Sequence, residues 1–372
     1  MDRYRRQRVW TTSNDWNFRM ISVAHLVDDS AVGGVTRFLD ALTGELGEKV
    51  RQSRISVKPL ATLPPRIDAD VVIVHFTMSW SKLPFLLALR ARFGTRPIVL
   101  VEHSYSAAFE RLAVPAPHRF RMMLRSSYRL VDRVVSVSYG QARWMRAAHL
   151  LPADKLSVIY PFTDCTELAA LQQPAPKYGP LSLGAYGRYC AQKDFSTLLA
   201  AMSLIDPAIA TLTLRGFGPD TKALTAQAEP LSNVNVGAKI DNLSDFLSTV
   251  DAIAVPSRFE PFGQVAYEAR LAGRPIIVTD VDGLPEQVDE LNGIVVPVGD
   301  AEVLAGAICQ MAVSRRLGPW SEMCQAARMS ASTHTAISAG HWKTLLGTLG
   351  TSNRPFIGAN DTSQLLHQHH TH

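Results

Sequence analysis

The sequence predicts an α/β protein with two doubly wound parallel sheets. Short apolar runs that end on a polar residue alternate with helical patterns, as the buried strands of parallel sheets do. This alternation occurs twice, on either side of a segment rich in proline and glycine. The length of 372 residues also suits two domains, each with its own core. We therefore expect two Rossmann-like domains that face each other across a cleft.

The first domain is expected to span residues 21–165, after a basic tail at 1–20. Its predicted strands are 21–27, 69–74, 97–101, 133–137 and 156–160. A helix is expected from about Val35, directly after the adjacent glycines Gly33 and Gly34. Because parallel strands end at the same edge, the residues that follow them are expected to line the cleft.

A linker is predicted at 166–180, and the second domain at 181–335. The predicted strands of the second domain are 181–186, 210–214, 234–236, 252–255, 276–278 and 293–296, with helices at 195–204 and 300–313. Helical signal returns at 336–350 in a segment that can cross back onto the first domain. The polar tail at 351–372 is expected to be mobile.

The composition is that of a soluble globular protein, with 47% hydrophobic and 19% charged residues. No apolar run reaches the length of a membrane-spanning helix, and residues 1–20 lack the apolar region of a secretory signal. The four cysteines are widely spaced and read as reduced thiols. A cytoplasmic location is expected. The formal net charge of +5 favours anionic partners without choosing among them.

The most informative segment is 256–268, which places Glu260 and Glu268 across a strand-to-helix junction. Glu260 is predicted to follow a strand at the edge where α/β sheets bind ligands. Phe262 and Gly263 begin the next helix, whose free backbone N–H groups attract anions. One carboxylate can then face a sugar and the other a ribose.

This segment and four further elements resemble family four of the retaining glycosyltransferases, which have the two-domain GT-B fold. The further elements are residues 33–37, the run 186–188 with Lys193, the turn 216–218, and residues 273–280 followed by Gly283 and Glu286. A single pair of glutamates at this spacing would be weak support, whereas five elements in the family's order are specific. The resemblance covers most of the chain.

The resemblance implies roles for the charged residues of the second domain. Arg188 and Lys193 would contact the donor diphosphate in place of a metal ion, because the departing diphosphate gains negative charge. Glu260 would orient the donor sugar, and Glu268 would bind the ribose hydroxyls. No cofactor is expected besides the nucleotide-diphosphate sugar itself.

In the first domain, the resemblance implies that the loop at Gly33 and Gly34 approaches the donor diphosphate. Glycines before a helix leave backbone N–H groups open to phosphate. His103 is expected to close a strand and to face the cleft, where its ring could donate to the sugar or its backbone could support developing charge. His75, at the end of the preceding predicted strand, is interpreted as structural.

Two carboxylate pairs could in principle hold a divalent metal. Asp280 and Asp282 belong to a strand-to-turn segment of the family pattern, and Asp68 and Asp70 lie near the amino end of a strand. Neither pair is interpreted as a metal site. The histidines of the tail at 367–372 are expected to be irrelevant to catalysis.

An arginine stripe is a further candidate for binding. Arg121, Arg125, Arg129 and Arg133 recur every four residues, which would place them along one face of a helix. Such a face can bind an anionic membrane surface, and the basic residues of the tail at 1–20 would add to it. It can equally be a solvated surface. Nucleic-acid binding is not expected, because no recognition motif accompanies the charge.

The sequence thus predicts a retaining, metal-independent hexosyltransferase that passes a sugar to a hydroxyl of a glycan or lipid-linked acceptor, in cell-surface polysaccharide synthesis. Transfer could proceed through a carboxylate nucleophile or by same-face attack, and the same-face route is favoured. The alternative is a catalytically silent GT-B protein that serves as a binding partner. The sugar, the base and the acceptor are not specified by the sequence.

Overall fold

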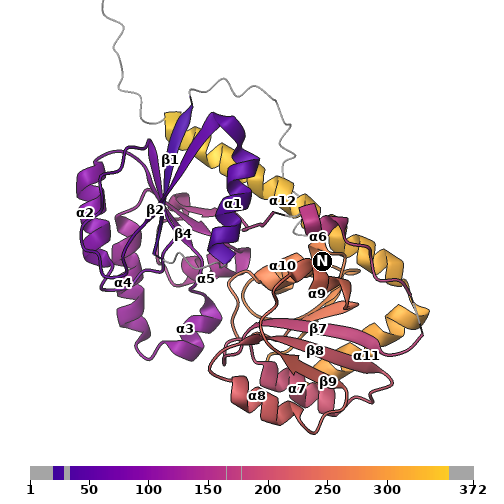
Figure 1. The fold of residues 1–372 in the computed structure, drawn as a ribbon. Helices are drawn as coiled ribbons and strands as arrows, with labels where there is room; N and C mark the ends of the chain where they lie inside the picture. The colour runs from indigo at the N-terminus through magenta and orange to yellow at the C-terminus, as the bar shows by residue number, and fades with distance from the viewer. Residues whose placement is uncertain (1–19, 29–33, 165, 177, 352–372) are drawn as a thin grey trace, which may run out of the picture.

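The protein has two parallel sheets, each covered by helices (Figure 1). The computed structural model describes residues 20–28, 34–164, 166–176 and 178–351. Both sheets contain six strands. The fold is therefore the predicted α/β architecture with two Rossmann-like halves. Within the described residues, no helix combines the length and apolar character that a bilayer-crossing segment needs.

The first sheet has the strand order β2-β1-β3-β4-β5-β6, with every pair parallel. Its strands are β1 (Ile21–Val27), β2 (Val50–Ser56), β3 (Val71–Val74), β4 (Ile98–Glu102), β5 (Arg133–Ser136) and β6 (Leu156–Val158). The central strands β3 and β4 are buried at every position, as their apolar sequences predict.

The strand β2 is absent from the sequence prediction. Its sequence, VRQSRIS, is polar and only partly buried, because β2 lies at the edge of the sheet and has one neighbouring strand. A search for apolar runs cannot find such a strand. This edge strand carries Gln52.

The second sheet has the order β12-β11-β10-β7-β8-β9, again with parallel pairs. Its strands are β7 (Leu181–Arg188), β8 (Ala210–Phe217), β9 (Val234–Gly237), β10 (Ala252–Val255), β11 (Ile276–Thr279) and β12 (Gly293–Val296). The strand order reverses between β10 and β7, so the loops that follow these strands lie at a switch point of the sheet.

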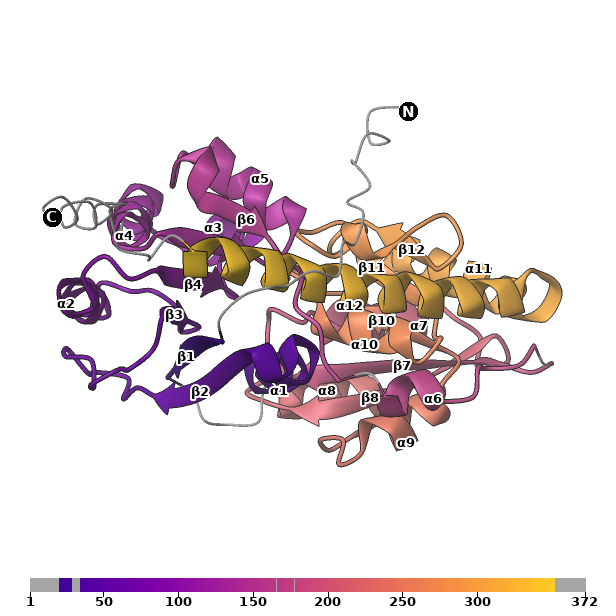
Figure 2. The same ribbon diagram turned by 90° about the horizontal axis from the view of Figure 1, so that it is seen from above.

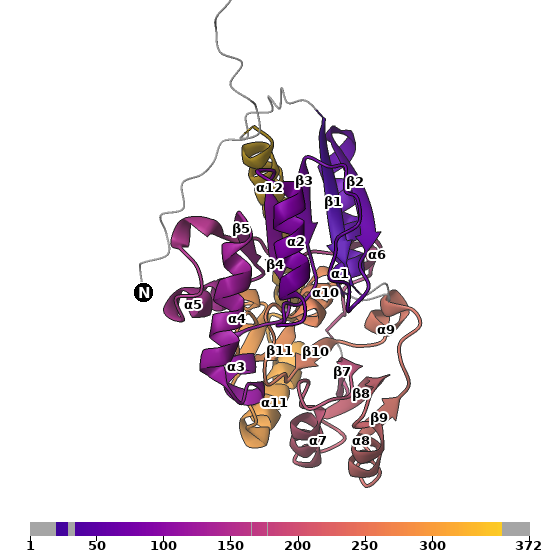
Figure 3. The same cartoon turned by 90° about the vertical axis from the view of Figure 1, so that its left-hand side faces the viewer.

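Helices connect the strands and cover both sheets (Figures 1 and 3). Those of the first half are α1 (Gly34–Leu46), α2 (Leu83–Phe93), α3 (Ala107–Ala113), α4 (Pro117–Arg129), α5 (Tyr139–Ala147) and α6 (Thr166–Ala170). Those of the second are α7 (Phe195–Ser203), α8 (Thr221–Ala228), α9 (Leu243–Ser248), α10 (Gln264–Leu271) and α11 (Ala301–Leu317). Short 3-10 helices are η1 (Gly47–Lys49), η2 (Ala153–Lys155) and η3 (Pro285–Gln287). The segment interpreted as a linker contains α6.

The last helix, α12 (Trp320–Thr351), runs along both halves of the molecule (Figure 2). It packs against α10 and α11 and then against α1 and β3. Near its end Trp342 is buried, with its ring 6.0 Å from that of Phe38. The sequence indicated only residues 336–350 as helical. The earlier half was missed because its many serine, threonine and alanine residues carry little apolar periodicity.

Candidate functional site

The carboxyl edges of the two sheets face each other. Phe109, in α3 after β4, packs edge to face on Phe259, which follows β10, with ring centroids 5.4 Å apart. Arg37 of α1 forms an ion pair with Glu268 of α10. Figure 3 shows α10 between the two halves. Glu268 and the loop that carries Glu260 therefore lie where the two domains meet.

Glu260 lies in the loop between β10 and α10, beside Lys193 from the loop after β7. The Nζ atom of Lys193 is bound to Oε2 of Glu260, which also accepts a hydrogen bond of 3.2 Å from the Ser257 hydroxyl. The two charged side chains are 17% and 13% exposed, so solvent screens the pair little. The structure thus brings together two residues that the sequence interpretation placed at one site.

Arg188 is the last residue of β7. Its side chain is exposed and forms no hydrogen bond or ion pair with any residue that the structure describes. The neighbouring Gly187 has φ +147°, and a Cβ there would lie 3.6 Å from Cε of Lys193. The positive φ is what favours glycine at this position, because a Cβ would make only an ordinary contact there.

Glu268 is fully buried and paired. Its Oε2 accepts a hydrogen bond of 2.7 Å from the Tyr186 hydroxyl, and its Oε1 lies 2.7 Å from Nη1 of Arg37. Burial raises the pKa of Glu268, while Arg37 and Tyr186 act in the opposite direction. The sequence interpretation included residue 37 in a family element but assigned it no role, because the contact joins two domains.

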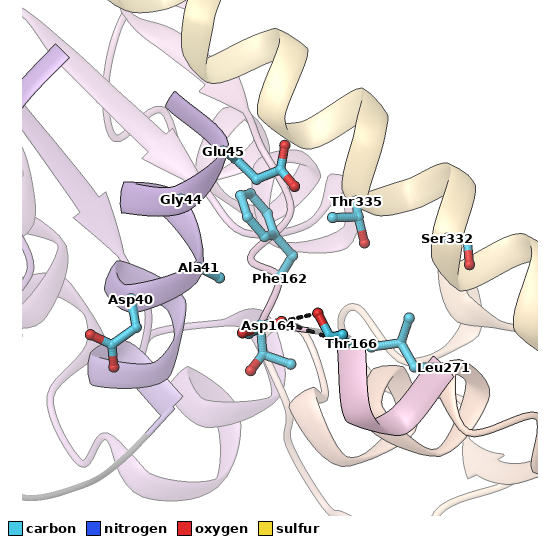
Figure 4. A pocket seen from close by; sticks show the side chains of 11 residues that line it. Asp40, Ala41, Gly44, Glu45, Phe162, Asp164, Thr166, Leu271, Ser332 and Thr335 are labelled. Carbon is cyan, nitrogen blue, oxygen red and sulfur yellow. Dashed lines mark hydrogen bonds between the residues drawn. The ribbon is translucent and has the colours of Figure 1, made fainter. Parts of the chain in front are cut away.

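A cavity of about 360 Å³ opens beside this pair and is lined by Arg37, Glu268, Asn242, Leu243 and Asp164 among others. Figure 4 shows a neighbouring cavity of about 320 Å³ between α1, α6 and α12. Its charged lining consists of Asp40, Glu45 and Asp164, so it repels a diphosphate. The first cavity shares Asp40 and Asp164 with it, but it also contains the buried carboxylate of Glu268 and the cation of Arg37.

Gly263 caps α10 with φ +97°, and a Cβ there would lie 2.4 Å from Cδ2 of Leu284. The Phe262 side chain is 4% exposed and packs against Tyr160, Tyr267 and His334. Phe262 was expected to bind the donor. Its ring belongs to the core, so only its backbone N–H is left for that role.

Asp282 joins the two domains, which the sequence interpretation missed. Its Oδ2 accepts hydrogen bonds from the Ser106 hydroxyl at 2.7 Å and from the backbone N–H of Glu260 at 2.9 Å. Its Oδ1 accepts one from the N–H of Ala108 at 3.1 Å. The carboxylate thus fixes the Glu260 loop against α3. Its backbone φ of +48° marks the tight turn that directs it there.

Glu286 forms a second link between the domains. Its carboxylate accepts hydrogen bonds from the N–H groups of Tyr139 and Gly140 at the start of α5, and one of 2.8 Å from the Tyr160 hydroxyl. These N–H groups have no partner inside the helix, so the acceptor satisfies them. A family element of the sequence therefore has a structural role in holding the two domains together.

Among the remaining predicted residues, Gly33 lies outside the described residues. Gly34 begins α1, and a Cβ there would have no heavy atom within 4 Å. His103 follows β4, as expected. Its Nε2 lies 3.1 Å from Nδ1 of His75, and burial lowers its pKa to about 4.

The arginine stripe is only partly correct. Arg121, Arg125 and Arg129 lie on α4, but the helix ends at Arg129 and Arg133 belongs to β5. Arg121 forms a bidentate pair with Glu110, at 2.6 and 3.0 Å. Arg125 donates to the carbonyl oxygens of Ala148 and His149. Two of the four arginines therefore stabilise the first domain itself.

The buried histidines predict a pH dependence of stability. Burial lowers the pKa of His25 and His103 to about 4 and that of His75 further below the usual 6.5. The unfolded chain takes up protons near pH 6.5, whereas the folded chain does so only near about pH 4. The unfolded state then binds more protons between these values, so the free energy of unfolding is expected to fall as the pH falls. Urea unfolding at about pH 7 and about pH 5 measures this, and equal values would contradict it.

The comparisons with known proteins show the family. Residues 180–313 match the family described as glycosyl transferases group 1, and residues 44–167 match glycosyltransferase family 4. A D-inositol 3-phosphate glycosyltransferase of Xylanimonas cellulosilytica is 30% identical over 298 residues, which is 69% of this chain and 70% of that protein. The fold and the relatives define a GT-B protein. The chain belongs to family four of the glycosyltransferases.

Other relatives match over shorter stretches. The lipopolysaccharide core biosynthesis glycosyltransferase LpsE of Rhizobium meliloti is 30% identical over 200 residues, covering 52% of this chain and 57% of LpsE. The chain spans about half the length of the first curated relatives it matches. The solved structure of Anabaena HepE in complex with UDP superposes with a TM-score of 0.69, at 17% identity over 88% of this chain and 100% of that chain. At this identity the likeness shows the fold.

Proposed function

We propose that this protein is a retaining glycosyltransferase that moves a sugar from a nucleotide-diphosphate sugar to a hydroxyl of a glycan or lipid-linked acceptor. The observation that carries the proposal is the pairing of Lys193 with Glu260, together with Arg188 at the end of β7, whose side chain has no ion-pair partner among the residues that the structure describes. These groups lie at the carboxyl edge of the second sheet, where α/β folds bind their ligands.

The arrangement suits both charges that the reaction creates. Cleavage of the sugar–phosphate bond leaves positive charge at the anomeric carbon and extra negative charge on the diphosphate. Arg188 and Lys193 would receive the diphosphate, and Glu260 would lie on the side of the sugar. Glu268, beside the cavity of about 360 Å³, would accept hydrogen bonds from the ribose hydroxyls.

Same-face attack is the route that the geometry supports better. The Oε2 atom of Glu260 already accepts from Lys193 and Ser257, so this carboxylate is held as an acceptor for sugar hydroxyls. In the same-face route the departing phosphate takes the proton of the acceptor hydroxyl, and no carboxylate attacks the sugar.

Cell-surface polysaccharide assembly on the cytoplasmic side is the proposed setting, which the named role of LpsE supports. A binding screen with UDP-, GDP- and ADP-sugars, followed by turnover with the tightest ligand, tests the function. Binding without turnover on any offered hydroxyl would favour the silent binding protein instead. No binding of any nucleotide sugar would refute both.

Activity is expected to survive excess EDTA, because Arg188 and Lys193 supply the positive charge that a metal would bring. The Asp280 side chain is exposed, and both oxygens of Asp282 accept hydrogen bonds from the protein. Initial rates with and without chelator measure this. Loss of turnover in EDTA that is restored by Mg²⁺ or Mn²⁺ would contradict the metal-independent account.

Association with an anionic membrane surface is proposed through the outer face of α4. The cations that face solvent there are Arg119 and Arg129, next to the exposed side chain of Met122. We expect sedimentation with anionic vesicles that weakens as salt rises. The double variant Arg119→Gln/Arg129→Gln should sediment less, while Arg316→Gln in the second domain serves as control. Equal sedimentation of all three proteins would exclude this face.

A further inference from the structure

A chain of three histidines crosses the first sheet along neighbouring strands. Gln52 lies on β2, His25 on β1, His75 directly after β3 and His103 directly after β4, in the order that these strands have in the sheet. The Gln52 Oε1 atom lies 3.1 Å from Nε2 of His25, and Nδ1 of His25 lies 2.9 Å from Nε2 of His75. Nδ1 of His75 lies 3.1 Å from Nε2 of His103.

Burial favours the neutral form of all three rings. His25 is 1% exposed, His75 is 5% exposed, and burial lowers the pKa of each. Burial alone lowers the pKa of His103 to about 4. A neutral imidazole has one N–H donor and one bare nitrogen acceptor. Every link of the chain must therefore run in the same direction, because each ring donates on one side and accepts on the other.

The amide of Gln52 selects that direction. Its oxygen faces Nε2 of His25 and can only accept, so His25 carries its proton on Nε2. Nδ1 of His25 then accepts from Nε2–H of His75, and Nδ1 of His75 accepts from Nε2–H of His103. The remaining nitrogen, Nδ1 of His103, is left without a proton.

Packing holds the His103 ring, the last member of the row of histidines, in place. The rings of His75 and His103 are stacked with centroids 5.4 Å apart, and Phe38 of α1 lies against both, at 6.3 and 6.2 Å. The His103 ring is half-buried, so part of it remains accessible. Nδ1 of His103 has no hydrogen-bond partner within the part of the chain that the structure describes.

We propose that Gln52, His25 and His75 are positioning residues that fix His103 in the Nε2–H form, so that its Nδ1 accepts a hydrogen bond from a substrate hydroxyl. The identity of the substrate rests on the proposed function. In the opposite form, His103 would present an N–H donor to the same position. The distant Gln52 thus decides which hydrogen bond His103 offers.

The proton positions can be measured without any substrate. Nitrogen-15 NMR of histidine-labelled full-length protein separates protonated from bare ring nitrogens, and the His103 signals are assigned by their loss in His103→Gln. We expect the proton of His103 on Nε2 and a bare Nδ1. A proton on Nδ1 would overturn the inference. Because this result does not depend on turnover, an inactive protein with a bare Nδ1 would refute the proposed function alone.

Variants of Gln52 test whether the hydrogen-bonded histidines affect activity. Gln52→Leu removes the acceptor, so His103 should become a mixture of both forms, and kcat should fall roughly 3- to 10-fold, as for one neutral hydrogen bond. Gln52→Glu keeps an acceptor and should keep the Nε2–H form. Arg51→Leu, an exposed change on the same strand, should alter neither property.

Donor hydrolysis in water distinguishes the source of the hydroxyl. If Gln52→Leu slows both hydrolysis and transfer, His103 accepts from the donor sugar. If it slows transfer alone, the hydroxyl belongs to the acceptor. Unchanged kcat for both reactions, despite a mixed His103 signal, would overturn the role of Nδ1 as an acceptor for substrate.

Discussion

Nucleoside diphosphate binding is expected to weaken roughly 10- to 150-fold in Glu268→Ala, the loss of about 1.5–3 kcal/mol for a hydrogen bond to a charged group. Glu268 is fully buried but lines the cavity of about 360 Å³, in which we expect the ribose to bind. Calorimetry with the free nucleoside diphosphate measures the change. Glu290→Ala, on the surface of the same domain, is the matched control.

Two further results would bear on this assignment. Glu268→Gln keeps an acceptor of the same shape and should lose less affinity than the alanine variant, because a ribose hydroxyl can still donate to the amide oxygen. Unchanged affinity in Glu268→Ala would show that the ion pair with Arg37 has a structural role only.

The second large effect concerns Glu260. Glu260→Ala should lower kcat by roughly 100- to 1,000-fold, the range for removing one preorganised group from a reacting centre. The carboxylate is fixed by Lys193, by Ser257 and, through its backbone, by Asp282. Its contacts with the sugar should strengthen as positive charge develops, so the transition state loses more than the bound donor does.

Steady-state kinetics beside calorimetry separates this role from that of Glu268. Nucleoside diphosphate affinity should change little in Glu260→Ala, because this residue would contact the sugar. Equal loss of affinity in both alanine variants would contradict the division of roles. Unchanged turnover in Glu260→Ala would remove the residue from catalysis.

The fold was largely predictable because the four central strands β3, β4, β10 and β11 are fully buried. β3, β4, β10 and β11 are continuous apolar runs that end near glycine, proline or polar residues. The edge strand β2 was not predicted, because a strand with a neighbour on one side only can remain polar. The first half of α12 was not predicted, because its small residues pack well between helices but do not form a repeating pattern of apolar positions.

The site was predictable only within each domain. Lys193 and Glu260 follow strands of one sheet that meet at one edge, so their proximity follows from the fold class. The hydrogen bond between Ser106 and Asp282 joins residues 176 positions apart in two domains. Nothing in either local sequence shows how the domains align, and the contact of Arg37 with Glu268 was missed for the same reason.

The hydrogen bonds that join His25, His75 and His103 could not be predicted from the sequence either. His75 was interpreted as structural and His103 as functional, whereas the structure joins both to His25 and Gln52. Recognising this from the sequence requires the strand order β2-β1-β3-β4, and β2 was not predicted. Only the assembled sheet shows that these four side chains form one chain.

Sugar transfer with retention at Glu260 can be tested by the configuration of the first product. Proton NMR can follow the sugar released when the protein turns over α-linked UDP-, GDP- or ADP-sugars, before the free sugar equilibrates. We expect the α-anomer to appear first and its formation to be lost in Glu260→Ala. Initial release of the β-anomer would contradict it.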